Sequence, residues 1–341
     1  MTTLNTHTRA ATFASLALLP ALRTLAMLAT TFVALGAFSS AVVAQQLESP
    51  LRIQVGYAPG GSSDRAARLV AQALQAKYGT TVIVENKAGA GGRLVPQQLK
   101  LAKATDNVLM IGNPAVMTVA PVVFKDNGYD PDEDFVPLSE VMSYEFVVAV
   151  GAQVPVRNIA ELTEWLKQNP QKAFFGVPAT GSLPHFFALM LADRAGIKAE
   201  VVGYKGSAPL ATELLGGQVP VGIDTVDSVL PLHQAGKVRI LAVSGKRRSS
   251  FAPDIPTLAE QNVQLAAEGW NTLYAPKSMP AAKAAEYAKA IQAVMADPEV
   301  QKQFRAGNME PVSSSQEQTM AMLKAYRAQW EPVVKRSGYQ P

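Results

Sequence analysis

Cysteine is absent from the 341 residues, and histidine occurs only three times. A chain without cysteine has no disulfide, no thiolate nucleophile and no thiolate metal site. One histidine, His7, falls in the first 44 residues, which leaves His185 and His233. Two histidines cannot form a multi-histidine metal site, and a catalytic triad would have to use one of them. We therefore expect neither a metal nor a cofactor.

The sequence also lacks the motifs of common nucleotide and hydrolase sites. No serine stands in a Gly-x-Ser-x-Gly elbow, and no Gly-Lys-Ser/Thr triplet completes a P-loop. The run Gly89-Ala90-Gly91-Gly92 follows a predicted strand, but Leu94 stands where a dinucleotide fingerprint needs its third glycine. We interpret this run as a flexible connection from strand to helix, or as part of the rim of a binding site.

Basic residues form no concentrated patch. The net charge is +4, and two of the surplus cations, Arg9 and Arg23, precede the first acidic residue. The densest basic group, Lys246-Arg247-Arg248, has no interleaved aromatic residue and is typical of a solvated loop. We therefore expect no nucleic-acid partner.

The N-terminal residues have the pattern of a secretory leader. An uncharged stretch after Arg23 contains an apolar core at Leu25–Phe38, which is short for a membrane span. Small residues end the stretch at Val42-Val43-Ala44, as at a signal-peptidase site. The leader has no cysteine for lipid attachment and no paired arginines. We predict a signal peptide over residues 1–44, cleavage after Ala44 and a periplasmic protein.

From Leu51 onward, short runs with strand character alternate with helical runs, as they do in parallel α/β proteins. The predicted strands are 51–57, 81–85, 108–112, 146–150, 173–176, 200–203, 219–224, 240–244 and 269–275. The predicted helices are 64–78, 94–102, 159–169, 184–195, 208–215, 228–235, 281–296, 298–306 and 315–337. The sequence therefore predicts an α/β fold.

The order of these elements predicts two lobes. The first lobe ends near Met142, Val154-Pro155 opens a new α/β unit, and the strand at 269–275 returns to the first lobe. We expect one lobe from residues 45–142 and 263–341 and a second lobe from residues 143–262. Two crossings between lobes imply a hinge, with a ligand cleft between the lobes.

Two turns rich in glycine and serine stand after predicted strands, where open α/β sheets bind ligands. They are Ala58–Asp64 (APGGSSD) and Val177–His185 (VPATGSLPH), and each precedes a helical run. Glycine permits close backbone approach, serine caps the helix, and the helix N-terminus offers N–H groups and positive charge. These turns, and the neighbouring segments 112–117 and 224–227, contain no lysine or arginine. An anion would bind through N–H groups, hydroxyls and water; ordinary helix capping is the alternative.

Several polar residues near the turns admit two interpretations. Ser182 and His185 are a helix cap with a first-turn residue, or a nucleophile with its base. Asp64 complements the dipole in the first turn of its helix, or it contacts the ligand. Asp224 and Asp227 offer a carboxylate to a ligand ammonium, or Asp227 caps the following helix.

Six short motifs follow one another in a fixed order. They are Tyr57-Ala58-Pro59-Gly60-Gly61-Ser62-Ser63-Asp64, Val84-Glu85-Asn86-Lys87-Ala88-Gly89-Ala90-Gly91-Gly92, Tyr129-Asp130-Pro131 with Asp134-Phe135, Tyr204-Lys205-Gly206-Ser207-Ala208-Pro209, Leu214-Leu215-Gly216-Gly217-Gln218-Val219, and Asp254-Ile255-Pro256-Thr257-Leu258-Ala259-Glu260. With this order and spacing, the chain from Leu51 to Pro341 resembles the tripartite tricarboxylate transporter receptors, extracytoplasmic solute receptors also called Bug proteins.

The resemblance implies a type 2 periplasmic binding fold whose two α/β lobes close on a small organic carboxylate. Such a receptor passes its ligand to a membrane permease, or reports it to a sensor, and performs no catalysis. By position, the ligand-binding residues would be Ala58, Gly60, Gly61, Ser62 and Ser63 in the first loop, Thr180, Gly181, Ser182 and His185 in the second, and Asn113, Ala115, Asp224 and Thr225 at strand ends.

The chain departs from the family pattern in each part of this expected site. Ser62-Ser63 adds a hydroxyl to the first loop, Leu183-Pro184 stands where a serine or threonine usually precedes the histidine, and Asp224-Thr225 stands where the family often has Asp-Asn. The identity of the carboxylate therefore stays open. The alternatives are a sensor partner or orphan receptor with a degenerate pocket, and an exported serine hydrolase that uses Ser182 with His185.

Overall fold

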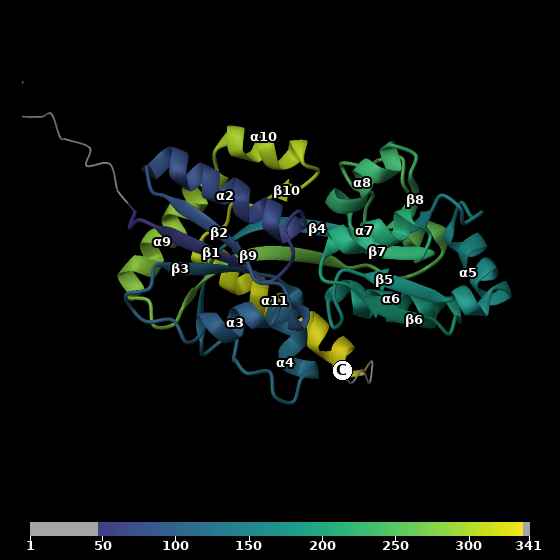
Figure 1. The fold of residues 1–341 in the computed structure, drawn as a ribbon, viewed down its shortest axis with the longest axis horizontal. Coiled ribbons are helices and arrows are strands. Elements are labelled where there is room, and N and C mark those ends of the chain that lie inside the picture. Colours follow the sequence, from purple (N-terminus) through teal and green to yellow (C-terminus); the bar gives the residue numbers. More distant parts are fainter. Residues whose placement is uncertain (1–46, 337–341) are drawn as a thin grey trace, which may run out of the picture. The chain divides into compact units, whose positions relative to one another are not determined.

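The computed structural model describes residues 47–336, and the predicted signal peptide lies outside them. The described residues form a ten-stranded sheet (Figure 1), whose main path runs β2-β1-β3-β9-β4-β7-β5-β6, with β8 and β10 also paired to β4. The strands are β1 (Leu51–Val55), β2 (Val82–Asn86), β3 (Val108–Gly112), β4 (Phe135–Gly151), β5 (Phe174–Val177), β6 (Glu200–Gly203), β7 (Val221–Thr225), β8 (Val238–Val243), β9 (Glu268–Pro276) and β10 (Glu310–Pro311).

The helices between these strands follow the predicted alternation. They are α2 (Ser62–Tyr78), α3 (Leu94–Leu99), α4 (Ala120–Val123), α5 (Ile159–Gln168), α6 (Leu183–Ala195), α7 (Ser207–Leu215), α8 (Val226–Gln234), α9 (Ala281–Met295), α10 (Pro298–Ala306) and α11 (Gln316–Arg336). Apolar side chains at helical spacing bury one face of each longer helix; in α2 these include Ala66, Val70 and Leu74. The prediction of an α/β fold is confirmed.

The sheet is mixed, whereas the sequence predicted the parallel class. The pairs β1–β2, β1–β3, β5–β6 and β5–β7 are parallel. Strand β9 is antiparallel to β3 and β4, and β4 is antiparallel to β7 and β8. Connections through helices produce the parallel pairs. The sequence predicted the return of the strand at 269–275 to the first lobe, but not its antiparallel pairing with β3 and β4.

Strand β4 links the two halves of the sheet. Its first part, Phe135–Glu145, pairs with β9, and its second part, Phe146–Gly151, pairs with β7 and β8. The sequence predicted a strand over 146–150 alone. The missed part contains Pro137, which has no N–H group to donate, and its register with β9 shifts twice, so the two-residue alternation is interrupted.

Separate hydrophobic clusters lie on the two halves. Ile53 of β1, Val70 of α2 and Tyr287 of α9 belong to one cluster, and Phe175 of β5 and Phe187 of α6 belong to another. In Figure 1, α2, α9 and α10 lie on the same side of the view as β1–β3, whereas α5–α8 lie with β5–β8 on the other side. Of the C-terminal helices, which were predicted to pack on the first lobe, α9 contributes Tyr287 to the first cluster, whereas α11 contributes Trp330 to the second. The limits of the two lobes at residues 142 and 262 stay a prediction.

Candidate functional site

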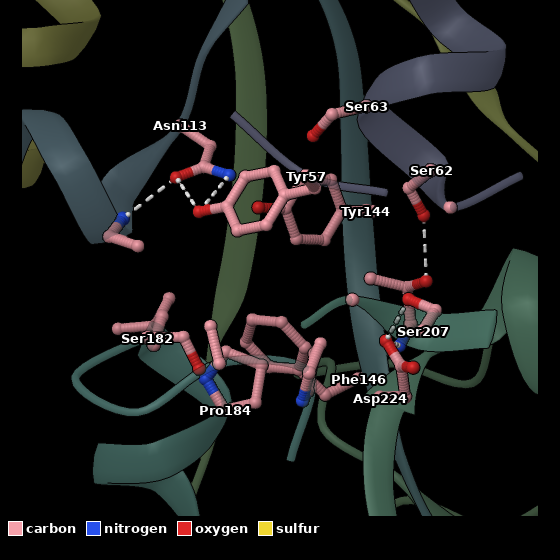
Figure 2. Close-up of a pocket in the computed structure, with 17 residues that line it drawn as sticks. Tyr57, Ser62, Ser63, Asn113, Tyr144, Phe146, Ser182, Pro184, Ser207 and Asp224 are labelled. Atoms are coloured by element: carbon pink, nitrogen blue, oxygen red, sulfur yellow. Dashed lines mark hydrogen bonds between the residues drawn. The ribbon is translucent and has the colours of Figure 1, made fainter. Parts of the chain in front are cut away.

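A pocket lies where the ends of β1, β3, β5 and β7 meet the first residues of several helices (Figure 2). It encloses about 60 Å³. Its lining includes these predicted ligand-binding residues: Gly61, Ser62, Ser63, Asn113, Ala115, Ser182, Asp224 and Thr225. Its lining also includes residues that the sequence did not indicate as ligand-binding: Tyr57, Tyr144, Phe146, Pro178, Ala179, Leu183, Pro184, Gly206 and Ser207.

One wall of the pocket is the N-terminus of α2. Gly60 has a φ of 90°, which favours glycine, and Gly61 is the extended N-cap residue, with no side-chain cap. The helix therefore begins at Ser62, two residues before the predicted start, and the expectation of a serine cap was wrong. The first hydrogen bond across the turn runs from the Arg65 N–H to the Gly61 carbonyl at 3.0 Å. The preceding N–H groups, including those of Ser62 and Ser63, have no acceptor within the helix.

Asp64 holds this loop in shape. Its carboxylate accepts hydrogen bonds from the Gly60 N–H at 2.9 Å and from Asn86 Nδ2 at 2.8 Å, and it forms an ion pair with Arg68. Burial alone would raise the pKa of Asp64, but the hydrogen bonds from Arg68, Gly60 and Asn86 bring it below its usual value. Asp64 is therefore an ionised residue in the first turn of α2, as predicted, and it is not part of the pocket lining.

The N-terminus of α6 forms a second wall. Ser182 is the N-cap and its side chain accepts a hydrogen bond from the His185 N–H at 3.4 Å. The Gly181 N–H donates to His185 Nδ1 at 2.8 Å, and Gly181 has a φ of 71°. Burial lowers the pKa of His185 to about 4, so its ring is neutral near pH 7. Because Nδ1 accepts from Gly181, His185 shapes the turn through this nitrogen, and the prediction of a cap with a first-turn residue is confirmed.

Asp224 lies at the end of β7, opposite the first residues of α7. Its Oδ1 accepts hydrogen bonds from the Thr225 N–H at 2.8 Å and from Ser207 Oγ at 3.0 Å. The side chain is 2% exposed and lines the pocket. Burial raises the pKa of Asp224 to about 7, although the two hydrogen bonds oppose this shift. Its carboxyl group therefore changes charge near neutral pH.

A buried polar cluster joins the first turn of α2 to α8. Ser62 Oγ lies 2.8 Å from Thr225 Oγ1 and donates to Asp227 Oδ2 at 2.6 Å. Arg65 forms an ion pair with the same Asp227 oxygen, and Asp227 is 1% exposed. Asp227 does not line the pocket and lies in the first turn of α8, whose N-cap is Thr225. The capping interpretation of Asp227 was therefore wrong, because its carboxylate binds Arg65 and Ser62 instead.

Aromatic and amide side chains complete the pocket (Figure 2). Asn113 Nδ2 donates to the Tyr57 hydroxyl at 3.0 Å, while Asn113 Oδ1 accepts from the Ala115 N–H at 3.1 Å. Burial raises the pKa of Tyr57 to about 12, so its hydroxyl stays neutral. Tyr144 and Phe146, both on β4, pack edge to face with ring centroids 5.7 Å apart. The pocket therefore combines polar loop ends with an aromatic wall.

Five predicted ligand-binding residues support the loops and do not line the pocket. Gly60 and Ala58 position the first loop: the Gly60 N–H binds Asp64, and the Ala58 N–H donates to the Lys205 carbonyl at 3.3 Å. Gly181 and His185 bind each other, as described above. Thr180 is exposed, and its side chain packs against Gly203, where a Cβ atom would collide with it. Their assignment to ligand binding stays a prediction.

Most of the lining residues that the sequence did not indicate fall into three groups. Gly206 and Ser207 belong to a motif that the sequence singled out, but nothing local shows that it approaches the first loop. Tyr144 lies in the part of β4 that was not predicted as a strand, and Phe146 is the first residue of the predicted part. Leu183-Pro184 was noted as a departure from the family, and the structure places both residues in the lining.

The pocket lining contains no lysine and no arginine, in agreement with the sequence of the cleft segments. Across residues 47–336, no cluster of three or more acidic, histidine or cysteine side chains could hold a metal ion. Within the same range, no helix has both the length and the apolar character needed to cross a membrane. Charge selection in this pocket therefore depends on helix ends, hydroxyl groups and Asp224.

Known proteins share this sequence and this fold. The family model for the "Tripartite tricarboxylate transporter family receptor" matches residues 66–339. A UPF0065 protein of Bordetella bronchiseptica is 31% identical over 292 residues, which cover 86% of this chain and 87% of that protein. The solved structure of the periplasmic binding protein BugD is 30% identical, with a TM-score of 0.81, over 86% of this chain and 99% of that one. Rpa4515 of R. palustris, solved with adipate, is 29% identical, with a TM-score of 0.82, over 85% and 98%.

Proposed function

The chain belongs to the tripartite tricarboxylate transporter receptor family, whose members are solute-binding receptors, and we propose that it captures a small organic carboxylate in the pocket described above. The ligand carboxylate would lie between the N-termini of α2 and α6. The receptor would pass its ligand to the membrane subunits of a tripartite tricarboxylate permease, or report it to a sensor kinase. It would perform no chemistry on the ligand.

The observation that carries this proposal is the convergence of two helix N-termini on a pocket without cationic side chains. Each helix end contributes about 0.3–1 kcal/mol to anion binding, and up to about 2 kcal/mol when partly buried. Micromolar affinity requires about 8 kcal/mol. The remainder must come from direct N–H and hydroxyl hydrogen bonds, each worth about 0.5–1.5 kcal/mol, and from ordered water. Gly61 and Ser63 present N–H groups and Ser182 presents a hydroxyl, whereas the Ser63 hydroxyl donates to Asn271 Oδ1 at 2.8 Å.

The similarity to Rpa4515 supports a carboxylate ligand, because that protein was solved with adipate and shares 29% identity over nearly its whole length. The identity is too low to transfer the ligand itself. Two departures from the family, Leu183 and Pro184, line the pocket of this chain and replace a hydroxyl with apolar surface. We therefore assign a carboxylate class and leave the individual ligand to experiment.

We further propose that residues 1–44 are a signal peptide and that the receptor works in the periplasm. The uncharged apolar core before Ala44 supports this assignment. Expression of the full chain in a Gram-negative host tests it directly. N-terminal sequencing of the protein recovered from the periplasm should begin at Gln45. An intact N-terminus, or retention of the protein in the cytoplasm, would contradict export with removal of a signal peptide.

The two predicted lobes, residues 45–142 with 263–341 and residues 143–262, would close on the ligand by a hinge motion in β4 and β9. The long-range pairing of β4 with both halves of the sheet supports this arrangement. Ligand would shift the population from open to closed molecules by its higher affinity for the closed form. Small-angle scattering should then give a smaller radius of gyration at saturating ligand, and an unchanged radius would contradict closure.

Isothermal titration tests the binding function. The periplasmic protein is unfolded and refolded to remove bound ligand, and is titrated with mono-, di- and tricarboxylates, aromatic acids and amino acids. Binding of one class with micromolar or lower Kd would support the receptor. If the folded protein binds none of these ligands, an orphan receptor with a degenerate pocket would be favoured. Turnover of a chromogenic ester that Ser182→Ala abolishes would favour the hydrolase instead.

A further inference from the structure

Of the two carboxyl oxygens of Asp224, only Oδ1 accepts hydrogen bonds from the described residues. Oδ1 accepts from the Thr225 N–H and from Ser207 Oγ, and no hydrogen bond within residues 47–336 reaches Oδ2. The side chain is 2% exposed, and what remains accessible belongs to the pocket lining. Oδ2 is not one of the fully buried atoms without a partner, so a ligand or water in the pocket can supply its hydrogen-bond donor.

The carboxyl group of Asp224 already binds the first residues of two helices. Ser207 is the first residue of α7, and Thr225 is the N-cap of α8; both donate to Asp224 Oδ1. Each of these helices has nine residues, so each contributes a positive end. At the start of α2, Asp64 and Asp227 bind the Gly60 N–H and the Ser62 hydroxyl from outside the lining. No carboxylate of the lining binds the first N–H groups of α2 or α6. The pocket is therefore receptive to an anion near α2 and α6, and to a donor near Asp224.

Resting on the proposed function, we propose that Asp224 selects carboxylates that also carry a hydrogen-bond donor, an ammonium group above all, over carboxylates whose second group is an ionised carboxylate. The first carboxylate of the ligand binds the ends of α2 and α6, and its donor binds Asp224 Oδ2. A second ionised carboxylate in the same place faces a like charge at hydrogen-bond distance. The pocket lining has no lysine or arginine, and Arg65, whose charge acts on Asp224 from outside the lining, is already paired with Asp227. Such a ligand binds only when one proton is shared between the two carboxyl groups.

The raised pKa of Asp224 agrees with this selection. With a pKa of about 7, the carboxyl group of the empty pocket is easily ionised or protonated near neutral pH. An ammonium ligand favours the ionised form, so its binding releases a proton from Asp224. A dicarboxylate favours the protonated form, so its binding takes up a proton. The two ligand classes therefore differ in the sign of the proton change.

Matched ligands provide the test. Succinate, glutarate and adipate are compared by titration calorimetry with the amino acids in which an ammonium replaces one carboxylate, namely β-alanine, 4-aminobutyrate and 5-aminopentanoate; propionate is compared with alanine. A hydrogen bond to a charged group is worth about 1.5–3 kcal/mol, so the ammonium ligand of the best-binding pair should bind about 10-fold to 100-fold more tightly. Asp224→Asn keeps the acceptor for Ser207 and Thr225 but turns a donating NH2 group to the ligand, so it should abolish or invert this preference.

The control is Asp193→Asn, which removes an exposed carboxylate from α6 and should leave the ratio of the two Kd values in each ligand pair unchanged. Equal affinities within each pair, or a preference that Asp224→Asn leaves intact, would overturn the inference while the receptor function stands. Absence of binding to all carboxylates would instead overturn the receptor function.

The proton change provides a measurement that does not depend on folding of the Asp224→Asn variant. Wild-type titrations at pH 7 in phosphate and in Tris, which differ in ionisation enthalpy, give the number of protons taken up. Uptake with dicarboxylates and release with ammonium ligands supports the inference. The same proton change for both classes overturns it.

Discussion

Ser62, in the first turn of α2, donates a hydrogen bond of 2.6 Å to Asp227, which lies 165 residues further along the chain in α8. Arg65, one turn later in α2, pairs with the same carboxylate oxygen. The Ser62 hydroxyl, predicted from the family to bind ligand, therefore joins two elements of the fold. The carboxylate that it binds is buried, which makes the contact sensitive to substitution.

Replacing Asp227 should destabilise the protein. Asp227→Asn keeps the volume of the side chain but removes the charge that pairs with Arg65. The loss of a buried charged hydrogen bond costs about 1–3 kcal/mol in free energy of unfolding. Urea unfolding followed by circular dichroism measures this loss. Lys302→Gln, in an exposed pair with Glu299, is the control and should change the free energy of unfolding by less than about 0.5 kcal/mol. An Asp227→Asn variant as stable as this control would show that the Ser62–Asp227–Arg65 cluster contributes nothing to folding.

Ser182→Ala and Ser62→Ala should differ in their effects on ligand binding. The Ser182 oxygen accepts from the His185 N–H and Ser182 lines the pocket, so its hydroxyl can donate to a ligand, whereas the Ser62 hydroxyl donates to Asp227. Ser182→Ala should raise the Kd of the bound carboxylate about 2-fold to 10-fold, as expected for one neutral hydrogen bond. Ser62→Ala should act mainly on the free energy of unfolding. Titration calorimetry and urea unfolding of both variants measure the two effects, and a larger rise in Kd for Ser62→Ala would reverse the assignment.

Local signals were sufficient for many elements. The predicted bounds of β3, β6 and α10 agree with the structure. For α10 the reason is visible in the sequence: Asp297 caps the helix by accepting from the Glu299 N–H at 2.9 Å, and Pro298 occupies the first helical position. For β3, five consecutive apolar or small residues are all buried, which is typical of a central strand.

These local signals did not predict which strands pair when they lie far apart in the sequence. The antiparallel insertion of β9 between β3 and β4 depends on contacts between residues more than 120 positions apart, such as Met142 with Asn271. The same limit applies to the site. Glycine and serine marked both loops because they have local backbone roles, whereas Ser207 and Tyr144 reach the pocket through the tertiary fold. The hydrogen bond from Ser62 to Asp227 is also a tertiary contact, which nothing local in the sequence indicates. The Ser62 hydroxyl was therefore assigned to the ligand from the family resemblance.

Removing a like-charge pair from the sheet should increase stability at alkaline pH. Glu145 of β4 lies directly opposite Glu268 of β9. Burial, with the charge of Glu268 adding to it, raises the pKa of Glu145 to about 7. A carboxyl group whose pKa is raised on folding stabilises the protein below its unfolded pKa, and this contribution is lost as the pH rises through about 7.

Glu268→Gln should therefore raise the free energy of unfolding by about 0.2–1 kcal/mol at pH 8, with a smaller gain at pH 5. Urea unfolding at both pH values measures the difference. The exposed Glu133→Gln is the control and should show no such dependence. A gain equal at both pH values would mean that Glu268 acts on Glu145 through packing and not through its charge.

His185 should make the protein less stable in mild acid. Its pKa is lowered to about 4 by burial, so the unfolded chain binds a proton at His185 before the folded protein does. The stability that the neutral ring contributes is therefore complete above pH 6.5 and is lost as the pH falls toward 4. Glu140, Glu145 and Asp224 have pKa values raised to about 7 and act in the opposite direction, so the contribution of His185 has to be isolated by substitution.

His185→Gln removes the titrating ring. Its cost in free energy of unfolding should be about 2 kcal/mol larger at pH 7 than at pH 4.5, because the wild-type protein loses that amount through protonation of the unfolded chain while the variant does not. The carboxyl groups titrate in both proteins and cancel in the comparison. Lys302→Gln, in an exposed ion pair, controls for general effects of pH on unfolding. A cost that is the same at both pH values would show that the folded protein binds a proton at His185 as readily as the unfolded chain does, so the Gly181 N–H could no longer donate to Nδ1 at pH 4.5.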